Sequence, residues 1–480
     1  MGLKSLKLNF IMNMILTVSN FLFPLVTFPY ISRVLQAEGV GKVTFIASVI
    51  AYFALFAQLG IPTYGIRASA KVRNNKEKLA KTVQEIFLIN LIMTILVYTI
   101  LAVVYLKVDR ISQDGTLFVI TSLTLLFNLI GMEWLYKGLE EYAYITIRSI
   151  IFKLLAVIFM FLFVHDIEDY VIYGAITIFA ASASSILNFI NIRKHVSFYS
   201  IRKDYNLKQH MRPILIFFTL SCATTIYTNL DTVMLGFMHN DIAVGYYTTS
   251  IKIKYILLSI VTSLGVVLLP RLSFYIQNGD KDKFMELSNK SFQFLTIIGF
   301  SITLYFIIYA KEAVYFLAGE SFKESILPMQ IILPTVILIG ITNLFGIQIL
   351  VPLGKEKLVV YSVIAGAIIN LILNIWLIPQ YSYLGTAFAN LIAESVVLLV
   401  QMYFIRDMIK DIVSGNNYIS IIFSLILASI TSIMSVSFID SDFSILIVSA
   451  VTFFVTYYVI LRMMKNKFVL DIEKQIFRRF

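Results

Sequence analysis

Residues 86–106 read IFLINLIMTILVYTILAVVYL, an apolar run without a charged side chain. At a rise of 1.5 Å per residue, a helix of this length spans about 30 Å, the thickness of the hydrocarbon core of a membrane. About thirteen further stretches of this kind, joined by mostly short loops, fill nearly the whole of the 480-residue chain. The sequence therefore predicts an all-α integral membrane protein with about 14 transmembrane helices and no soluble catalytic domain.

The composition excludes a soluble globular protein. Hydrophobic residues make up 59% of the chain, the mean hydropathy is +0.85 and charged residues contribute 14%, whereas soluble domains carry about 25% charged residues. The apolar run after the basic start Met1–Lys7 is too long for a signal peptide, so we expect it to remain as the first helix. The single Cys222 falls within a span and cannot form an internal disulfide bond.

The net charge of +11 reflects membrane topology, because Lys and Arg are unevenly distributed between the loops. About 29 of the 39 basic residues fall on the two chain ends and on alternate loops, about 4 on the other loops, and 6 in or at the ends of spans. The segment from Arg67 to Lys81 carries six, whereas the loop His165–Asp169 carries none. The positive-inside rule therefore predicts that both termini are cytoplasmic. Nucleic acid is not an expected partner.

The chain repeats weakly with an offset of about 204 residues. Val40-Gly41 corresponds to Val244-Gly245, and Leu59-Gly60 to Leu264-Gly265. Each unit holds six spans, so the copies share one orientation and predict a pseudo-two-fold axis along the membrane normal. The expected domains are residues 1–212 (six-helix bundle and linker), 213–412 (second six-helix bundle) and 413–480 (two additional helices and a basic cytoplasmic tail).

Polar residues inside two spans follow helical spacing. One stripe lies in the span 213–238 and the other in the span 8–33, and subtracting 204 superimposes them. Hydrogen bonds between helices would explain such stripes at about 0.6 kcal/mol per contact, but a water-filled cavity explains their symmetry better. The residues are Ser221, Thr224, Thr225, Thr228, Asp231 and Thr232 in one span, and Asn13, Thr17, Asn20, Pro24 and Thr27 in the other.

Charges within spans usually face a cavity or a partner, because a charge at the bilayer centre costs about 2.5 to 3.5 kcal/mol. Asp231, Lys252 and Lys254 are the deepest in the chain. Asp231 and Lys252 reach similar depth, so an ion pair is geometrically plausible. Lys252 and Lys254 are about 200° apart around one helix, so only one of them faces a given cavity, and we expect this to be Lys252.

Further charges lie in or beside the other spans. Arg148 and Lys153 share the span 144–164, and Glu133 lies near the end of the span before it. Arg33 and Lys42 stand at outer span ends, where either a functional role, snorkelling or pairing with Glu38 explains them. Snorkelling also remains open for Arg148, and Glu394 is either a helix-packing residue or a proton site.

Several motifs resemble the Wzx-type polysaccharide repeat-unit flippases of the MOP superfamily, which also contains the MATE-like multidrug exporters. The motifs are Phe28–Leu35 with Glu38–Gly41, Leu59–Arg67, Glu133–Leu135 with Lys137–Glu140, Tyr144–Arg148 and Asn229–Gly236. The resemblance implies twelve core helices in two bundles around a central cavity, plus two further helices. It also implies transport of an undecaprenyl-diphosphate-linked oligosaccharide across the plasma membrane for surface polysaccharide synthesis.

The charged and polar candidates fit such a substrate. A diphosphate needs Arg or Lys in a wet cavity, and hydroxyl and amide groups can bind sugars while the lipid tail stays in the bilayer. Alternating access would rock one bundle against the other. The substrate candidates are Arg33, Lys42, Arg148, Lys153, Lys252, Asn20, Thr224 and Thr228, and the candidates for an ion pair or for ion coupling are Asp231, Lys254, Glu133 and Glu394.

No catalytic residue, metal site or cofactor is expected. The expected partners are the lipid-linked oligosaccharide, membrane lipid and the polysaccharide polymerase machinery, with coupling to Na⁺ or H⁺ left open. A cation-coupled exporter of small molecules is a second hypothesis, but Lys and Arg outnumber Asp and Glu within the spans. A membrane-embedded sugar polymerase or transferase is a third hypothesis, for which the outer loops offer little acid–base chemistry.

The charge asymmetry predicts that Lys76 and Arg202 are cytoplasmic, whereas Asp166 and Asn240 are external. Cysteine introduced at each position in a Cys222→Ser background should react with an impermeant thiol reagent accordingly, and only the last two should react in intact cells. Labelling of Lys76→Cys from outside would overturn the topology.

Overall fold

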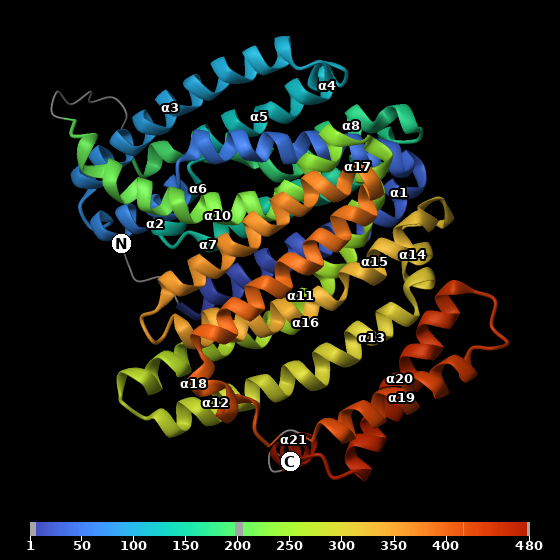
Figure 1. Ribbon diagram of the computed structural model, residues 1–480. Coiled ribbons are helices and arrows are strands. Elements are labelled where there is room, and N and C mark those ends of the chain that lie inside the picture. Colours follow the sequence, from blue (N-terminus) through green and yellow to red (C-terminus); the bar gives the residue numbers. More distant parts are fainter. Residues whose placement is uncertain (1–5, 197–204, 416, 478–480) are drawn as a thin grey trace. The chain divides into compact units, whose positions relative to one another are not determined.

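The computed structural model describes residues 6–196, 205–415 and 417–477, in which every regular element is helical (Figure 1). The predicted all-α membrane fold is confirmed, and the protein is a multi-pass membrane protein. The topology residue Arg202 lies outside the described residues. The chain divides into two compact units, Met1–Gly245 and Tyr246–Phe480, and each is described by itself.

The first unit contains ten α-helices within its described residues, with a π-helical segment, η2 (Phe179–Ala183), between α8 and α9. The helices are α1 (Leu6–Gln58), α2 (Ile61–Val72), α3 (Lys76–Lys107), α4 (Asp109–Ser112), α5 (Gly115–Gly131), α6 (Glu133–Gly138), α7 (Tyr142–Phe163), α8 (Tyr170–Ile178), α9 (Ser184–Asn191) and α10 (Lys208–Met238).

The second unit begins within α11 and ends with a helical pair and a short amphipathic helix. The helices are α11 (Asp241–Gln277), α12 (Lys281–Phe294), α13 (Phe300–Ile308), α14 (Ala310–Ala318), α15 (Ile326–Ile332), α16 (Pro334–Thr342), α17 (Glu356–Phe404), α18 (Arg406–Val413), α19 (Tyr418–Ser435), α20 (Asp442–Met463) and α21 (Lys467–Phe477).

Ten of the described helical segments are long and apolar enough to cross a membrane, and two bent helix pairs raise the number to twelve if each pair is one span. Two of the ten, Ile11–Val72 and Glu356–Phe404, contain a backbone break well inside their length. Counting each of these two as two crossings would give the fourteen that the sequence predicts, and that number stays a prediction.

The helix α17 is a hairpin rather than one straight rod. Its 49 residues are interrupted at Ser382, whose φ of 51° and ψ of −132° lie outside the helical region. The arms on either side of the break lie side by side, because the side-chain amide of Gln401 donates to the hydroxyl of Ser362 at 3.1 Å. A Cβ on Gly366 would lie 2.4 Å from the Val397 side chain. Gly366 thus permits the close packing of the two arms.

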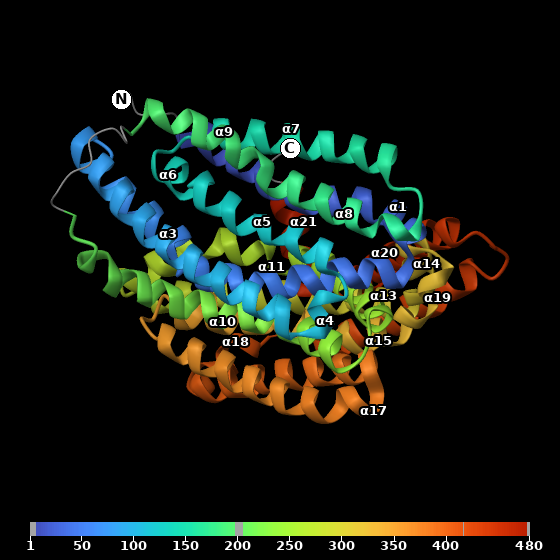
Figure 2. The same cartoon turned by 90° about the horizontal axis from the view of Figure 1, so that it is seen from above.

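The helix α1 breaks in the same way at Gln36, which has φ 54° and ψ −168°. A straight helix of its 53 residues would be about 80 Å long, far more than a membrane is thick. Figures 1 and 2 both show two arms of α1 running back from the bend beside its label. Each arm is long enough to cross the hydrocarbon core once.

Two glycines let the bend of α1 approach the start of α11. A Cβ on Gly41 would lie 1.8 Å from the Asp241 carbonyl oxygen, and a Cβ on Gly245 would lie 1.9 Å from the Ala37 carbonyl oxygen. Gly41 and Gly245 are also the two glycines that correspond in the weak sequence repeat, and the structure places both where the two backbones cross. The pseudo-two-fold axis itself stays a prediction.

Buried apolar clusters hold each unit together. In the first unit, Ile61, Leu79 and Trp134 belong to a cluster that joins α2, α3 and α6. In the second unit, Tyr305 of α13 donates to the Leu446 carbonyl oxygen at 2.7 Å, which attaches the C-terminal pair α19 and α20. Large apolar side chains elsewhere stay exposed, as expected for surfaces that face lipid.

The crossing at Gly41 predicts that Gly41→Ala destabilises the protein, because the added methyl group would overlap the Asp241 carbonyl. Overpacking of this kind costs about 1 to 3 kcal/mol, so we expect a lower Tm in detergent. Gly299→Ala is the matched control, because its Cβ would meet only Val261 at 3.9 Å. Equal Tm values for the two variants would contradict the tight crossing.

Candidate functional site

Lys153 belongs to α7, and its side chain contacts the first arm of α1. Its ammonium group donates to the hydroxyl of Ser19 at 2.9 Å and to the amide oxygen of Asn20. Lys153 is the twelfth of the 22 residues of α7, so it lies close to mid-height of this helix. The fold thereby brings together two predicted substrate residues, Lys153 and Asn20, that are 133 positions apart in the chain.

Arg148 precedes Lys153 by five residues, which places it about 140° further around the helix. Its side chain is buried with 5% exposed. One guanidinium nitrogen donates to the Ser184 carbonyl oxygen at 2.8 Å, and the guanidinium carbon lies 5.5 Å from the centre of the Tyr144 ring. Its Nε has no hydrogen-bond partner among the described residues. Arg148 therefore connects α7 to the start of α9 and retains one donor group.

Glu133 lies at the start of α6, close to both cations. Its carboxylate forms an ion pair with Lys137 at 2.8 Å and acts electrostatically on Arg148 and Lys153. Because Glu133 is exposed, water screens this attraction. The sequence analysis named all three residues as candidates.

Two further predicted cations, Arg33 and Lys42, lie on either side of the bend in α1. Arg33 is exposed and donates to the Pro29 carbonyl oxygen at 2.6 Å. Lys42 forms an ion pair with Glu38 at 2.9 Å, and its ammonium group lies 4.7 Å from the centre of the Tyr170 ring. The pairing of Lys42 with Glu38 is one of the alternatives that the sequence left open.

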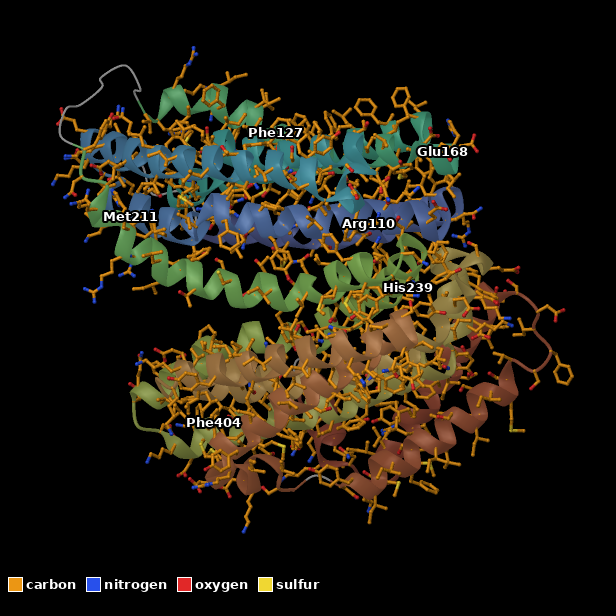
Figure 3. All side chains as sticks on the ribbon, turned by 45° about the horizontal axis from the view of Figure 1, so that its top comes forward. Arg110, Phe127, Glu168, Met211, His239 and Phe404 are labelled. Carbon is orange, nitrogen blue, oxygen red and sulfur yellow. The ribbon has the colours of Figure 1, made fainter. Side chains whose placement is uncertain are left out.

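Arg110, which the sequence analysis did not single out, organises the same end of the first unit. Its guanidinium binds the carboxylate of Asp241, donates to the Gly236 carbonyl oxygen at 3.0 Å and packs over the Phe45 ring at 4.6 Å. In Figure 3, Arg110, Glu168 and His239 lie at one end of the first unit and Met211 at the other. The sequence feature that could have identified Arg110 is its place on a predicted outer loop, where basic residues are rare.

A cavity of about 450 Å³ lies within the first unit, between the second arm of α1, α2, α5, η2 and α10. Part of the predicted polar stripe of α10 faces it, at intervals of four residues. Thr224 and Thr228, the two threonines of this stripe that the sequence predicts as substrate-binding residues, are exposed and do not line the cavity. The polar lining consists of Gln58, Thr121, Thr124, Ser221, Thr225 and Asn229.

The opposite end of the first unit carries a second buried polar cluster that the sequence analysis missed. The carboxylate of Glu85, 1% exposed, accepts from the backbone N–H of Asn206 at 2.8 Å and the side-chain amide of Gln209 at 2.9 Å. It also lies 2.8 Å from Nε2 of His210, whose Nδ1 lies 2.6 Å from the Tyr64 hydroxyl. These contacts fasten the start of α10 to α3 and α2.

In the second unit, a buried lysine again meets an asparagine. Lys254 of α11 is 4% exposed and donates to the amide oxygen of Asn390 in α17 at 3.0 Å. Glu394 follows Asn390 by one helical turn and is also buried. Lys252 is half-buried, as expected for a residue about 200° away from Lys254 around the helix.

Asp231 is buried in α10, within the first unit, whereas Lys252 belongs to the second. Because the two residues belong to different compact units, the ion pair between them stays a prediction. The described residues contain no group of three or more His, Cys, Asp or Glu side chains placed to bind a metal ion.

The fold is similar to solved structures of membrane transporters. It superimposes on "Lipid II flippase MurJ, inward closed conformation" with a TM-score of 0.71 and 16% identity, over 95% of this chain and 100% of that one. It superimposes on an inward-facing multidrug resistance MATE family transporter of the MOP superfamily with a TM-score of 0.62 and 12% identity, over 84% and 99% of the two chains. At these identities the likeness concerns the fold alone.

Sequence relatives come from polysaccharide biosynthesis. The chain is 25% identical over 407 residues to a protein of Escherichia coli (strain K12) named "Putative O-antigen transporter", covering 84% of this chain and 97% of that protein. It is 23% identical over 415 residues to the capsular polysaccharide biosynthesis protein CapF of Staphylococcus aureus, covering 84% and 99%. Residues 6–275, more than half of the chain, match the family described as polysaccharide biosynthesis protein. The chain therefore belongs to the polysaccharide biosynthesis protein family.

Proposed function

We propose that this protein is a flippase that carries undecaprenyl-diphosphate-linked oligosaccharide repeat units across the bacterial plasma membrane for surface polysaccharide synthesis. The observation that carries the proposal is Lys153, a cation near mid-height of a membrane-spanning helix that is hydrogen-bonded to Ser19 and Asn20. A relative named as an O-antigen transporter and a lipid II flippase of the same fold support it.

The chemistry of the substrate requires both kinds of group that the first unit contains. A diphosphate loses its hydration inside the membrane, and charge-assisted hydrogen bonds from Lys or Arg offset that loss. The cavity beside α10 offers hydroxyl and amide groups, which form hydrogen bonds with sugar hydroxyls, and its lining contains no carboxylate. The sugar hydroxyls and the phosphates can therefore form hydrogen bonds with the protein in place of those to water, which offsets the free-energy cost of burying them.

Transport would proceed by alternating access between two six-helix bundles, which we assign to residues 1–212 and 213–412, with residues 413–480 as an addition. Rocking of one bundle against the other would expose Arg33, Lys42, Arg148, Lys153 and Lys252 to each side of the membrane in turn. Asn20, Thr224 and Thr228 would contribute hydrogen bonds to the sugars. Both termini would lie in the cytoplasm, where the precursor is made, and the polymerase machinery would take the product on the outside.

The energy source would act through the buried charges that the substrate does not use. Asp231 and Glu394 are buried carboxylates in α10 and α17. Lys254 donates to Asn390, which lies one helical turn before Glu394 in α17. These residues and the exposed Glu133 are the candidates for coupling to Na⁺ or H⁺, because ionisable residues within membrane spans often mark ion pathways and proton relays.

A MATE-like exporter of cationic small molecules is the alternative that the fold permits. An exporter of cations would favour a cavity with acidic side chains, whereas the described lining of the polar cavity has none. The charged residues within the span of α7, Arg148 and Lys153, are basic. A membrane-embedded polymerase or transferase has less support, because the relatives and structural neighbours named for an activity are transporters or flippases.

Complementation of flippase-deficient strains that make different repeat units tests the proposal directly. We expect polymer export to be restored for at least one repeat unit. Absence of rescue in every strain at normal membrane levels, together with export of a cationic dye, would favour the small-molecule exporter instead.

Removing a substrate-binding cation should impair export. We expect Arg33→Ala, Arg148→Ala and Lys153→Ala to lower polymer export about tenfold, the effect of losing one charge-assisted hydrogen bond. Arg→Lys at the first two positions should also impair export, because a point charge replaces the bidentate fork. The effect should be smaller than that of alanine, because the positive charge remains. Arg406→Ala, on an exposed side chain of α18, is the control. Normal export by an alanine variant at wild-type protein level would remove that residue from the site.

Exchanging Asp231 and Lys252 separates a structural role from a functional one. If the two charges form a structural pair, removing either one strands its partner and should reduce the amount of folded protein, whereas Asp231→Lys combined with Lys252→Asp should restore much of it. We expect the double variant to fold but to fail in export, because the phosphate-binding and ion-coupling charges have changed helices. Recovery of both the amount of folded protein and polymer export in the double variant would show that the pair is only a structural contact.

A further inference from the structure

A second hollow of the first unit, here called the α1–α7 groove, lies outside the polar cavity described above. It has a volume of about 580 Å³ and runs between the first arm of α1 and α7. Its lining is apolar, including Val18, Leu22 and Leu154, apart from two polar residues, Ser19 and Lys153. The groove follows α1 from Met14 to Val26, a distance of about 18 Å. It is thus an elongated apolar channel with one cation in its wall.

The depth of Lys153 distinguishes this groove from an ordinary lipid-facing surface. Eleven residues of α7 precede Lys153 and ten follow it, so about 15 Å of helix separates it from either end. The phosphates of resting phospholipids lie at the two interfaces, about 15 Å from the bilayer centre. A phosphate meets Lys153 at this depth only when its lipid is crossing the membrane.

The ammonium group of Lys153 retains capacity for a ligand. An ammonium has three N–H donors, and within the described part of the chain two of them go to Ser19 and Asn20. These two bonds hold the lysine stem against α1 and keep the group from snorkelling to an interface. The third donor is available for an anion in the groove.

We infer that the α1–α7 groove binds the first isoprene units of a polyprenyl diphosphate, with the lipid-proximal phosphate on Lys153 while the headgroup crosses the membrane. The inference rests on the proposed function and adds to it a separate place for the lipid. The apolar walls remove the chain from contact with water and polar groups, and Lys153 neutralises the phosphate. The sugar is then free to occupy the polar cavity.

Site-specific photo-crosslinking tests the inference. The photoreactive residue p-benzoyl-phenylalanine replaces Leu22 in the groove or, as a control, Ile158, which is exposed on α7 but does not line the groove. Purified protein is placed in vesicles of phosphatidylethanolamine and phosphatidylglycerol that contain a small fraction of undecaprenyl diphosphate or of uncharged undecaprenol. We expect the Leu22 position to form adducts with undecaprenyl diphosphate in preference to phospholipid and undecaprenol, and the Ile158 position to form mainly phospholipid adducts.

Two further variants keep the outcome decisive. Lys153→Met should lower the undecaprenyl diphosphate adduct about tenfold, the effect of one charge-assisted hydrogen bond, to the level of undecaprenol. The control Lys107→Met, on an exposed residue at the end of α3, should leave the adduct unchanged. Val18→Trp should reduce the adduct by filling the groove without lowering protein level, because Val18 is exposed.

Equal phospholipid adducts at the two positions, adducts within the protein chain itself, or insensitivity to Lys153→Met would each overturn the groove as a polyprenyl site. Failure of the proposed function is recognised separately, by adducts that form as expected in a protein that rescues no flippase-deficient strain. Normal export in Val18→Trp cells, with export lowered in Lys153→Met cells, would leave the flippase in place and remove the groove alone.

Discussion

The absence of water in the hydrocarbon core is the constraint on which the structure depends. Each polar group that enters the membrane must find its partner within the protein, because an unsatisfied group costs several kcal/mol there. Helices satisfy the backbone, and serine and threonine hydroxyls bond to carbonyl oxygens one turn earlier, as Thr17 does to Asn13 and Thr296 to Phe292. The polar groups that remain must be matched between helices, and these matches locate the functional regions.

The same solution recurs in both units. Lys153 of α7 donates to Asn20 of α1, and Lys254 of α11 donates to Asn390 of α17. In both places an uncharged amide oxygen accepts the hydrogen bond from the ammonium group. The two sites differ in surroundings, because Lys254 is almost fully buried whereas Lys153 borders an open apolar groove.

The two ends of the first unit are fastened by different chemistry. Arg110 gathers Asp241 and the Gly236 carbonyl at one end, and Glu85 gathers the start of α10 at the other. Both clusters therefore act on α10, the helix that carries Asp231 and lines the polar cavity. A shift of α10 against the rest of the first unit would therefore break contacts in at least one of these clusters.

The sequence by itself determined the membrane class, the helical fold and the family, because hydropathy, charge asymmetry and local motifs are properties of short segments. It also identified Lys153, Asn20 and Lys254 as unusual, since a polar residue in an apolar span is visible without any partner. Only the tertiary structure decided which of them meet. Lys153 and Asn20 lie 133 positions apart in the sequence, and the packing of α7 against α1 alone brings their side chains together. The cavity lining has the same origin, because the packing of α10 sets the rotation of this helix about its own axis. Ser221 and Thr225 of the predicted stripe face the cavity, whereas Thr224 and Thr228 of the same stripe do not.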